Sequence, residues 1–233
     1  MKTILLSTFL LAVLSSPAFG SENKLPEWLD TGSWAEGVDY CDHRLVDDLS
    51  QRSDLRDLSA AYLSRLAVYC SALASGKGDE AGSGWWWYTA ASLDLKAAES
   101  LLSELRKKGF LQTLPAPRSL GPASARGEDD KKMVRLPSGE NVPGTPPRPL
   151  GKQKIPSYMF HPGRGVVLVS VAVEVVISKD GVPRQPLLVE AHALPAHVLF
   201  AYQFLRGWRF EPAKVNGEPV ECLYRLTVST RRT

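Results

Sequence analysis

The 233-residue sequence predicts an α+β protein in three parts: a small N-terminal helical domain, a proline-rich linker, and a C-terminal antiparallel sheet with one helix packed across it. Three observations lead to this fold class. Apolar residues recur at helical spacing between residues 52 and 108, prolines crowd the middle of the chain, and strict apolar alternation with turn signals marks the last third. We therefore assign 21–113 to the helical domain, 114–156 to the linker and 157–233 to the sheet module.

The first twenty residues are typical of a cleavable signal peptide. Lys2 precedes an apolar run over Ile4–Leu14, and Ala18–Gly20 has the small-x-small pattern of a cleavage site. The run is shorter than the roughly 20 apolar residues that a membrane-spanning helix needs, so no membrane span is expected after cleavage. We expect an exported protein, periplasmic or secreted, that begins near Ser21.

The net charge and the number of cysteines limit which partners and which disulfides the chain can have. A formal net charge of +3 does not indicate a nucleic-acid or membrane-surface partner. Export permits disulfides, and three cysteines leave one unpaired. Cys41 and Cys70 lie in the same helical region, where they form either a disulfide or two separate buried thiols. Cys222 lies on the apolar face of the last predicted strand, which favours a free buried thiol.

Apolar spacings of three and four predict the helices of the first domain. A first helix covers about Arg52–Ala74, and Ser21–Tyr40 before it carries few periodic signals, so we expect an irregular arm there. Residues 79–84 indicate a polar loop. Trp85–Leu93 predicts a short helix, and Asp94 is a suitable N-cap for a further helix that runs to Lys108.

The tandem tryptophans Trp85, Trp86 and Trp87 indicate either a ligand platform or core packing. Three adjacent residues on a helix point in three directions and cannot form one flat surface, so core packing is favoured. An enzyme or ligand binder with its site around Trp85–Tyr88 stays open as an alternative.

Other chemistry-bearing residues give no catalytic pattern. His192 and His197, five apart near the start of the C-terminal helix, are interpreted as surface residues. The chain has no G-x-S-x-G elbow and no His-Glu-x-x-His pair. We predict no catalytic residue, no metal and no cofactor, hence a protein that is not an enzyme. The densest cluster of side chains that could bind a metal is Cys41, Asp42, His43, Asp47 and Asp48. Helix capping and a solvated acidic face explain this cluster better than a zinc site does.

Between residues 114 and 156, prolines alternate with glycine, serine and basic residues. Such a segment has too little apolar content to offset its ordering entropy, which predicts an extended, semi-stiff linker. Within it, Met133–Leu136 predicts a brief strand or a docking site.

The C-terminal module begins with an alternating strand, Val167–Ile177, whose one face is wholly apolar and whose other face carries Ser170 and Glu174. Asp180-Gly181 predicts a hairpin. The returning strand, Val182–Glu190, holds two prolines and belongs partly at a sheet edge.

A helix over Pro195–Arg206 follows, and Gly207 ends it. Trp208 and Phe210 then alternate with charged residues, and we interpret them as a wedge that seats the helix on the sheet. Asn216-Gly217 is a second turn signal before the last strand, which ends near Val228.

Together these motifs resemble the C-terminal domain of TonB-type energy transducers over about the last third of the chain. The resemblance rests on the alternating strand that ends in Asp-Gly, the helix, the run Trp-Arg-Phe-Glu-Pro-Ala at 208–213, and Asn216–Val228. Ile155–Tyr158 also resembles the Tyr-Pro region that precedes the first strand in that family, although no proline follows Tyr158. The positions that carry the family signature, all read as structural, are Gly181, Trp208, Phe210, Pro212 and Gly217.

The resemblance implies an antiparallel sheet with one helix across it, at work in the periplasm. Members of the family bind short extended segments of outer-membrane transporters by strand addition. The chain departs from the family in having a cleavable signal peptide and a helical domain in place of a membrane anchor, so energy transduction is not implied. The last strand is then the candidate docking edge, with Leu223, Tyr224, Arg225, Leu226, Thr227 and Val228.

We therefore expect an exported, non-enzymatic protein that binds a peptide or protein partner, with a link to outer-membrane transport. The structural alternative is a module that mediates self-association, as a homodimer, through the same sheet edge.

Overall fold

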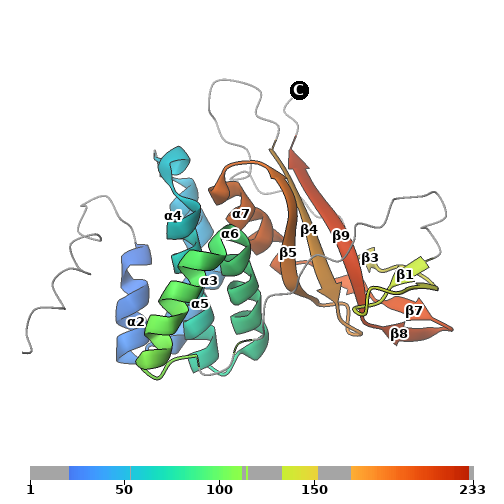
Figure 1. Ribbon diagram of the computed structural model, residues 1–233, viewed down its shortest axis with the longest axis horizontal. Helices are drawn as coiled ribbons and strands as arrows, with labels where there is room; N and C mark the ends of the chain where they lie inside the picture. The colour runs from blue at the N-terminus through green and yellow to red at the C-terminus, as the bar shows by residue number, and fades with distance from the viewer. Residues whose placement is uncertain (1–20, 53, 112–113, 115–132, 152–168, 231–233) are drawn as a thin grey trace, which may run out of the picture.

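The computed structural model describes residues 21–52, 54–111, 114, 133–151 and 169–230. The predicted signal peptide and Ile155–Tyr158 lie outside the described residues. Helices gather on one side of the molecule and an antiparallel sheet on the other, with the last helix between them (Figure 1). No helix in the described ranges is long and apolar enough to cross a membrane.

The N-terminal part is helical from its first described residue. Its elements are η1 (Ser21–Lys24), α2 (Leu25–Thr31), α3 (Trp34–His43), α4 (Leu45–Ser50), η2 (Leu55–Asp57), α5 (Ala60–Gly76) and α6 (Glu80–Lys107). The irregular arm expected over Ser21–Tyr40 is therefore wrong. Helices α2 and α3 are too short for a strong periodic signal, and the burial of Leu25, Leu29 and Tyr40 against the other helices stabilises them.

Side-chain caps decide where the two long helices begin. The Ser59 hydroxyl accepts a hydrogen bond from the Tyr62 amide, so α5 starts at Ala60 rather than near Arg52. Asp79 accepts from the Gly82 amide, so the segment expected as a polar loop is already the first turn of α6.

Helix α6 is two helices joined at a kink. Asp94 has non-helical backbone angles, and its carboxylate accepts a hydrogen bond from the Ala97 amide. This confirms Asp94 as the N-cap of a further helix. The buried Ser64 hydroxyl of α5 hydrogen-bonds the carbonyls of Ala90 and Asp94 beside the kink, so α5 and α6 are held together where the helical ladder is interrupted.

The C-terminal part holds a five-stranded antiparallel sheet of order β2-β1-β9-β4-β5 and two short strand pairs, β3-β6 and β7-β8. Helix α7 (Pro195–Arg206) contacts β4 and β5. The strands are β1 (Met133–Arg135), β2 (Asn141–Pro143), β3 (Arg148–Pro149), β4 (Val169–Ile177), β5 (Pro183–His192), β6 (Phe210–Glu211), β7 (Ala213–Val215), β8 (Glu218–Val220) and β9 (Cys222–Thr230).

The structure differs from the predicted linker over residues 133–150. This segment forms β1, β2 and β3, and β3 pairs with β6 beyond the helix. The Thr145 and Lys214 backbones exchange two hydrogen bonds of 2.8 and 2.9 Å. Prolines are compatible with these short strands because each lies at a turn or a strand end, where no ladder hydrogen bond from its nitrogen is needed.

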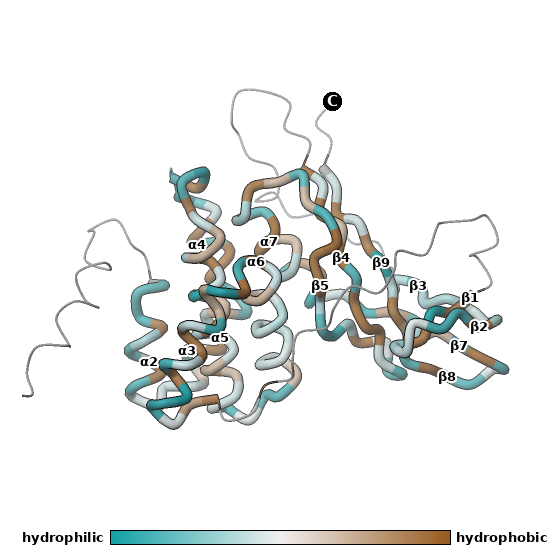
Figure 2. Tube along the Cα trace, in the orientation of Figure 1, coloured by the Kyte–Doolittle hydropathy of each residue, from teal (hydrophilic) through white to brown (hydrophobic). Residues whose placement is uncertain are grey.

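The two parts share one hydrophobic core rather than two separate ones. Figure 2 shows hydrophobic residues along β4, and the alternating face of this strand is fully buried. Helix α7 contacts α4, α5 and α6 on one side and the sheet on the other. Each of the three tandem tryptophans is at most 3% exposed, which confirms that they are core residues.

Candidate partner-binding edge

Strand β9 lies inside the sheet order, and its two sides differ. On one side it pairs with β4 along its whole length, from Val169↔Thr230 to Ile177↔Cys222. On the other side the described pairing with β1 consists of Arg135↔Leu223 alone. The predicted docking edge is therefore occupied at Leu223. From Arg225 to Ser229, no pairing of the outer side of β9 is found within the described part of the chain.

The outer stretch of β9 lacks the features that usually protect a sheet edge. Between Leu223 and Thr230 the strand has no proline, no glycine and a single charge, Arg225. Arg225, Thr227 and Ser229 are exposed, whereas Leu226 and Val228 point into the core. Natural edge strands are commonly blunted by charges, prolines, bulges or a covering helix, and among the described residues this stretch carries only the charge of Arg225.

The opposite edge of the sheet, β5, carries several such features. Pro183 and Pro186 lie within it, Gln185 has a positive φ of 48°, and its register against β4 shifts twice. Helix α6 packs against β5, and the Leu188 amide donates a 3.4 Å hydrogen bond to the Ser92 hydroxyl. Strand addition at β5 is therefore blocked.

A buried ion pair crosses the sheet at the covered end of β9. Glu174 of β4 is only 6% exposed, and its Oε2 lies 3.4 Å from Nη1 of Arg135 in β1. A buried carboxylate requires a charged or hydrogen-bonding partner. The pair therefore fastens β1 to β4 across the start of β9.

Gly181, Trp208, Phe210, Pro212 and Gly217, the positions that carry the family signature, lie in turns and in contacts between helix and sheet. Trp208 contacts Phe204 of α7 and Phe210 of β6, with ring centroids 5.5 and 5.9 Å apart, and Phe210 contacts Tyr224 of β9 at 5.9 Å. This aromatic row supports the interpretation of Trp208 and Phe210 as a wedge between helix and sheet. Gly181 accepts a hydrogen bond from the Phe210 amide, Pro212 is half-buried between β6 and β7, and Gly217 forms the β7-β8 turn.

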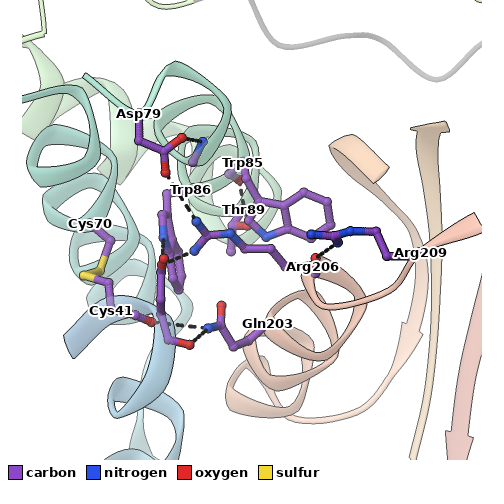
Figure 3. A network of polar contacts seen from close by, with 11 residues as sticks. Cys41, Cys70, Asp79, Trp85, Trp86, Thr89, Gln203, Arg206 and Arg209 are labelled. Atoms are coloured by element: carbon purple, nitrogen blue, oxygen red, sulfur yellow. Dashed lines mark hydrogen bonds and ion pairs between the residues drawn. A yellow bond between two sulfur atoms is a disulfide. The ribbon is translucent and has the colours of Figure 1, made fainter. Parts of the chain in front are cut away.

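The helical part holds α7 through a polar network shown in Figure 3. Arg206 forms an ion pair with Asp42, lies 3.7 Å from the Asp79 carboxylate and stacks over the ring of Trp86. Asp42 also accepts a 3.3 Å hydrogen bond from the indole of Trp86. Gln203 donates to the carbonyls of Cys41 and Asp42 in the last turn of α3, where helix carbonyls lack partners within the helix.

The cysteines and histidines that the sequence analysis singled out have structural roles or lie at the surface. Cys41 and Cys70 are joined by a disulfide, so of the two alternatives that the sequence left open the disulfide is present. Cys222 is a buried free thiol. The surface interpretation holds for His192 but is wrong for His197, which is 1% exposed and contacts Phe200 edge-on at 6.0 Å. His197 lies in the first turn of α7, which packs between the helices and the sheet.

The acidic cluster near Cys41 does not converge on one point. Asp42 pairs with Arg206, whereas His43 and Asp47 are exposed. Among the described residues, no group of three or more His, Cys, Asp or Glu side chains is placed to hold a metal ion. Sequence reasoning missed Arg206 and Gln203, because no local pattern links α7 to the end of α3.

Comparison with known proteins gives no match: no protein-family model, no curated protein and no solved structure is similar to this chain. The C-terminal part is an antiparallel sheet with one helix packed on it, and no match bears on the resemblance to TonB-type domains.

Proposed function

We propose that this chain is an exported, non-enzymatic protein that binds an extended segment of a peptide or protein partner. The segment adds as a strand to the outer side of β9 between Arg225 and Ser229. The TonB resemblance suggests an outer-membrane transporter as the partner and the periplasm as the compartment. The disulfide is compatible with an oxidising compartment of this kind.

The contrast between β5 and the outer stretch of β9 carries the proposal. β5 has prolines, bulges and a covering helix, whereas the outer stretch of β9 has a single charge. An incoming strand would satisfy backbone groups on β9 and place alternate side chains beside Leu226 and Val228. The partner would therefore contribute backbone hydrogen bonds for affinity and apolar side chains for selectivity.

A matched pair of proline variants tests this mode of binding. A library of random ten-residue peptides is selected on the mature chain, and affinities are measured by fluorescence anisotropy. Neighbouring residues of a strand point their backbone groups to opposite sides. One of Leu226→Pro and Thr227→Pro therefore breaks the β4 ladder and the other removes an outward amide, and Leu226→Pro also removes a buried core side chain.

The expected result is that the variant with unchanged circular dichroism and melting loses peptide binding. Hydrogen exchange of the Arg225–Ser229 amides in the wild-type chain should slow when peptide is bound. Unchanged affinity in the folded proline variant, or protection elsewhere in the chain, would contradict strand addition at β9.

Self-association through the same edge is the second candidate, and the charge pattern of β9 favours it. In antiparallel pairing of two copies centred on Thr227, Arg225 lies opposite Ser229 of the other copy, so like charges do not meet. Light scattering separates the two candidates. A stable dimer that does not bind selected peptides favours self-association, whereas a monomer that binds them favours a peptide or protein partner.

A further inference from the structure

The disulfide and the polar contacts of α7 meet in one short segment of the chain. Cys41 of α3 is bonded to Cys70 of α5, and the carbonyl of Cys41 accepts a hydrogen bond from Gln203 of α7. The next residue, Asp42, forms the ion pair with Arg206. Figure 3 shows the disulfide on one side of Cys41 and Gln203 on the other. Cys41 and Asp42 thus form the seat of α7, and one of the two carries the cross-link.

We infer that oxidation of Cys41 and Cys70 completes the seat of α7, so that the sheet module docks less tightly on the helices while both thiols are reduced. The class of reaction that must act on this chain is thiol–disulfide exchange with a disulfide oxidant. Two thiols of the chain and one disulfide of the oxidant give one disulfide of the chain and two thiols of the oxidant. The inference concerns the junction between the two parts and does not depend on strand addition at β9.

The disulfide fixes the end of a short helix. Helix α3 has ten residues and α4 after it has six, and helices of this length are marginal without tertiary contacts. The face of α3 towards α5 includes Gly37 and Cys41, four residues apart. A Cβ atom at Gly37 would lie 2.7 Å from the Leu73 side chain, and Cys41 is bonded to Cys70. The last turn of α3 is therefore held on α5 by close packing and by the covalent bond.

The contacts at the seat depend on accurate placement of α3. Hydrogen bonds and ion pairs weaken steeply when distances and angles change. The side chains of Asp42 and Arg206 are each only 20% exposed, so solvent screens this pair less than a surface pair. Asp79 and Trp86 hold the same guanidinium from the side of α6. If the end of α3 shifted, α7 would stay on α6 and lose the contacts that Asp42 and Gln203 make.

Burial of the sulfur atoms places oxidation before docking. Cys41 is 1% exposed and Cys70 is 0% exposed. Exchange requires a thiolate to attack a sulfur atom directly, so an oxidant must reach these positions before α3 and α5 have closed over them. The sheet module is then docked tightly in a compartment that supplies a disulfide oxidant, and less tightly in one that keeps thiols reduced.

Redox equilibria test the coupling, because coupling between two sites is reciprocal and the seat must in turn stabilise the disulfide. The mature chain is equilibrated from both directions with mixtures of reduced and oxidised dithiothreitol. Mass spectrometry after alkylation gives the oxidised fraction of Cys41 and Cys70. Arg206→Ala removes the ion pair, and Gln203→Ala removes the donor to the Cys41 carbonyl. Gly217→Ala, in the turn between β7 and β8, is the control for a general loss of stability.

Arg206→Ala should lower the equilibrium constant for oxidation at least about fivefold, as is typical of coupled sites, and Gln203→Ala should lower it too. Gly217→Ala should leave this constant within about twofold, as expected for a distant site. Urea denaturation supplies a second measurement. In the background Cys41→Ser/Cys70→Ser, Arg206→Ala should shift the unfolding equilibrium at least about fivefold less than it does in the chain with the disulfide.

Two results would overturn the inference. One is an unchanged oxidation equilibrium in Arg206→Ala. The other is an equal shift in Arg206→Ala and Gly217→Ala, which would show that the disulfide stabilises the fold as a whole. If Cys41→Ser/Cys70→Ser does not fold, the oxidation equilibria decide alone, and Gln203→Ala replaces Arg206→Ala should that variant not fold. Peptide binding enters neither measurement, so failure here leaves the proposed function to its own test.

Discussion

Arg206 in α7 forms an ion pair with Asp42 at the end of α3, 164 residues earlier in the chain. The contact joins the helical part to the sheet module, and Asp79 and Trp86 complete the surroundings of the guanidinium. The sheet module is thus seated on the helices by specific polar contacts as well as by the shared core.

Replacing Arg206 should destabilise the whole chain. Arg206→Ala leaves the half-buried Asp42 without its guanidinium partner, and we expect the free energy of unfolding to fall by about 1–3 kcal/mol. Arg206→Lys should recover only part of this, because lysine lacks the planar fork that stacks on Trp86. Urea denaturation followed by tryptophan fluorescence measures both.

The control for Arg206 is Lys108→Ala. Lys108 pairs with Asp30 at 3.4 Å, and both side chains are 58% exposed. Loss of such a surface pair should change stability by less than about 0.5 kcal/mol. Equal effects of the two alanine variants would show that the Arg206 contact does not join the two parts.

Removing the disulfide should cost more than removing the ion pair. The bond between Cys41 and Cys70 spans a sequence separation of 29 residues, for which loop-closure entropy corresponds to about 3–4 kcal/mol. The double variant Cys41→Ser/Cys70→Ser should lose roughly this much stability in chemical denaturation. Thiol titration of the denatured chain checks the premise: one reactive thiol before reduction and three afterwards, and three before reduction would refute the disulfide.

Cys222 should make the chain less stable in alkali. Burial, with a smaller contribution from Glu221, raises the pKa of this thiol from 9.0 to about 12. Above about pH 9 the unfolded chain gives up the proton that the folded chain keeps, so the free energy of unfolding falls as the pH rises towards 12. Below pH 9 this contribution to stability is fully present.

Urea denaturation between pH 7.5 and pH 10 measures the alkaline effect, before tyrosines such as Tyr62, whose pKa burial raises to about 12, contribute strongly. Cys222→Ala should flatten the pH dependence above pH 9, even though the smaller side chain lowers stability at every pH. An equally steep decline in Cys222→Ala would assign the effect to another group.

Two turn glycines give a matched pair for the hairpin geometry. Gly181 has a φ of 75°, and a Cβ atom there would lie 1.8 Å from the Phe210 carbonyl oxygen. Gly217 has a φ of 87°, but apart from its own residue and its chain neighbours no atom of the described residues lies within 4 Å of the position that its Cβ would take. Gly217→Ala should cost about 1 kcal/mol from backbone strain alone. Gly181→Ala should cost at least about 2 kcal/mol more, because the backbone must also move; equal melting temperatures would contradict this.

Local patterns in the sequence predicted much of the fold. The alternation of Val169–Ile177, the cap at Asp94 and the helix Pro195–Arg206 are determined by neighbours in the chain, and each is present. The short helices α2 and α3 and the strand β3 depend instead on contacts with distant residues. Propensity over so few residues is too weak to predict them.

The position of the last strand was predictable, but the pairing on its outer side was not. The apolar alternation of β9 indicates a strand with one buried face, and the resemblance suggested its role. The occupation of Leu223 by Arg135, and the closure of β5 by Ser92, follow from pairings between segments that are 88 and 96 residues apart. No periodicity in one segment specifies which distant segment will lie beside it.

The hydrogen bond from Leu188 to Ser92 also has a consequence for stoichiometry. Open-ended fibres require two compatible surfaces on every subunit, so that each copy can join a neighbour ahead and another behind. With β5 covered by α6, two copies that pair through the outer stretch of β9 use the same surface on each chain. Self-pairing therefore closes on a two-fold axis, and growth of such an assembly ends at two chains.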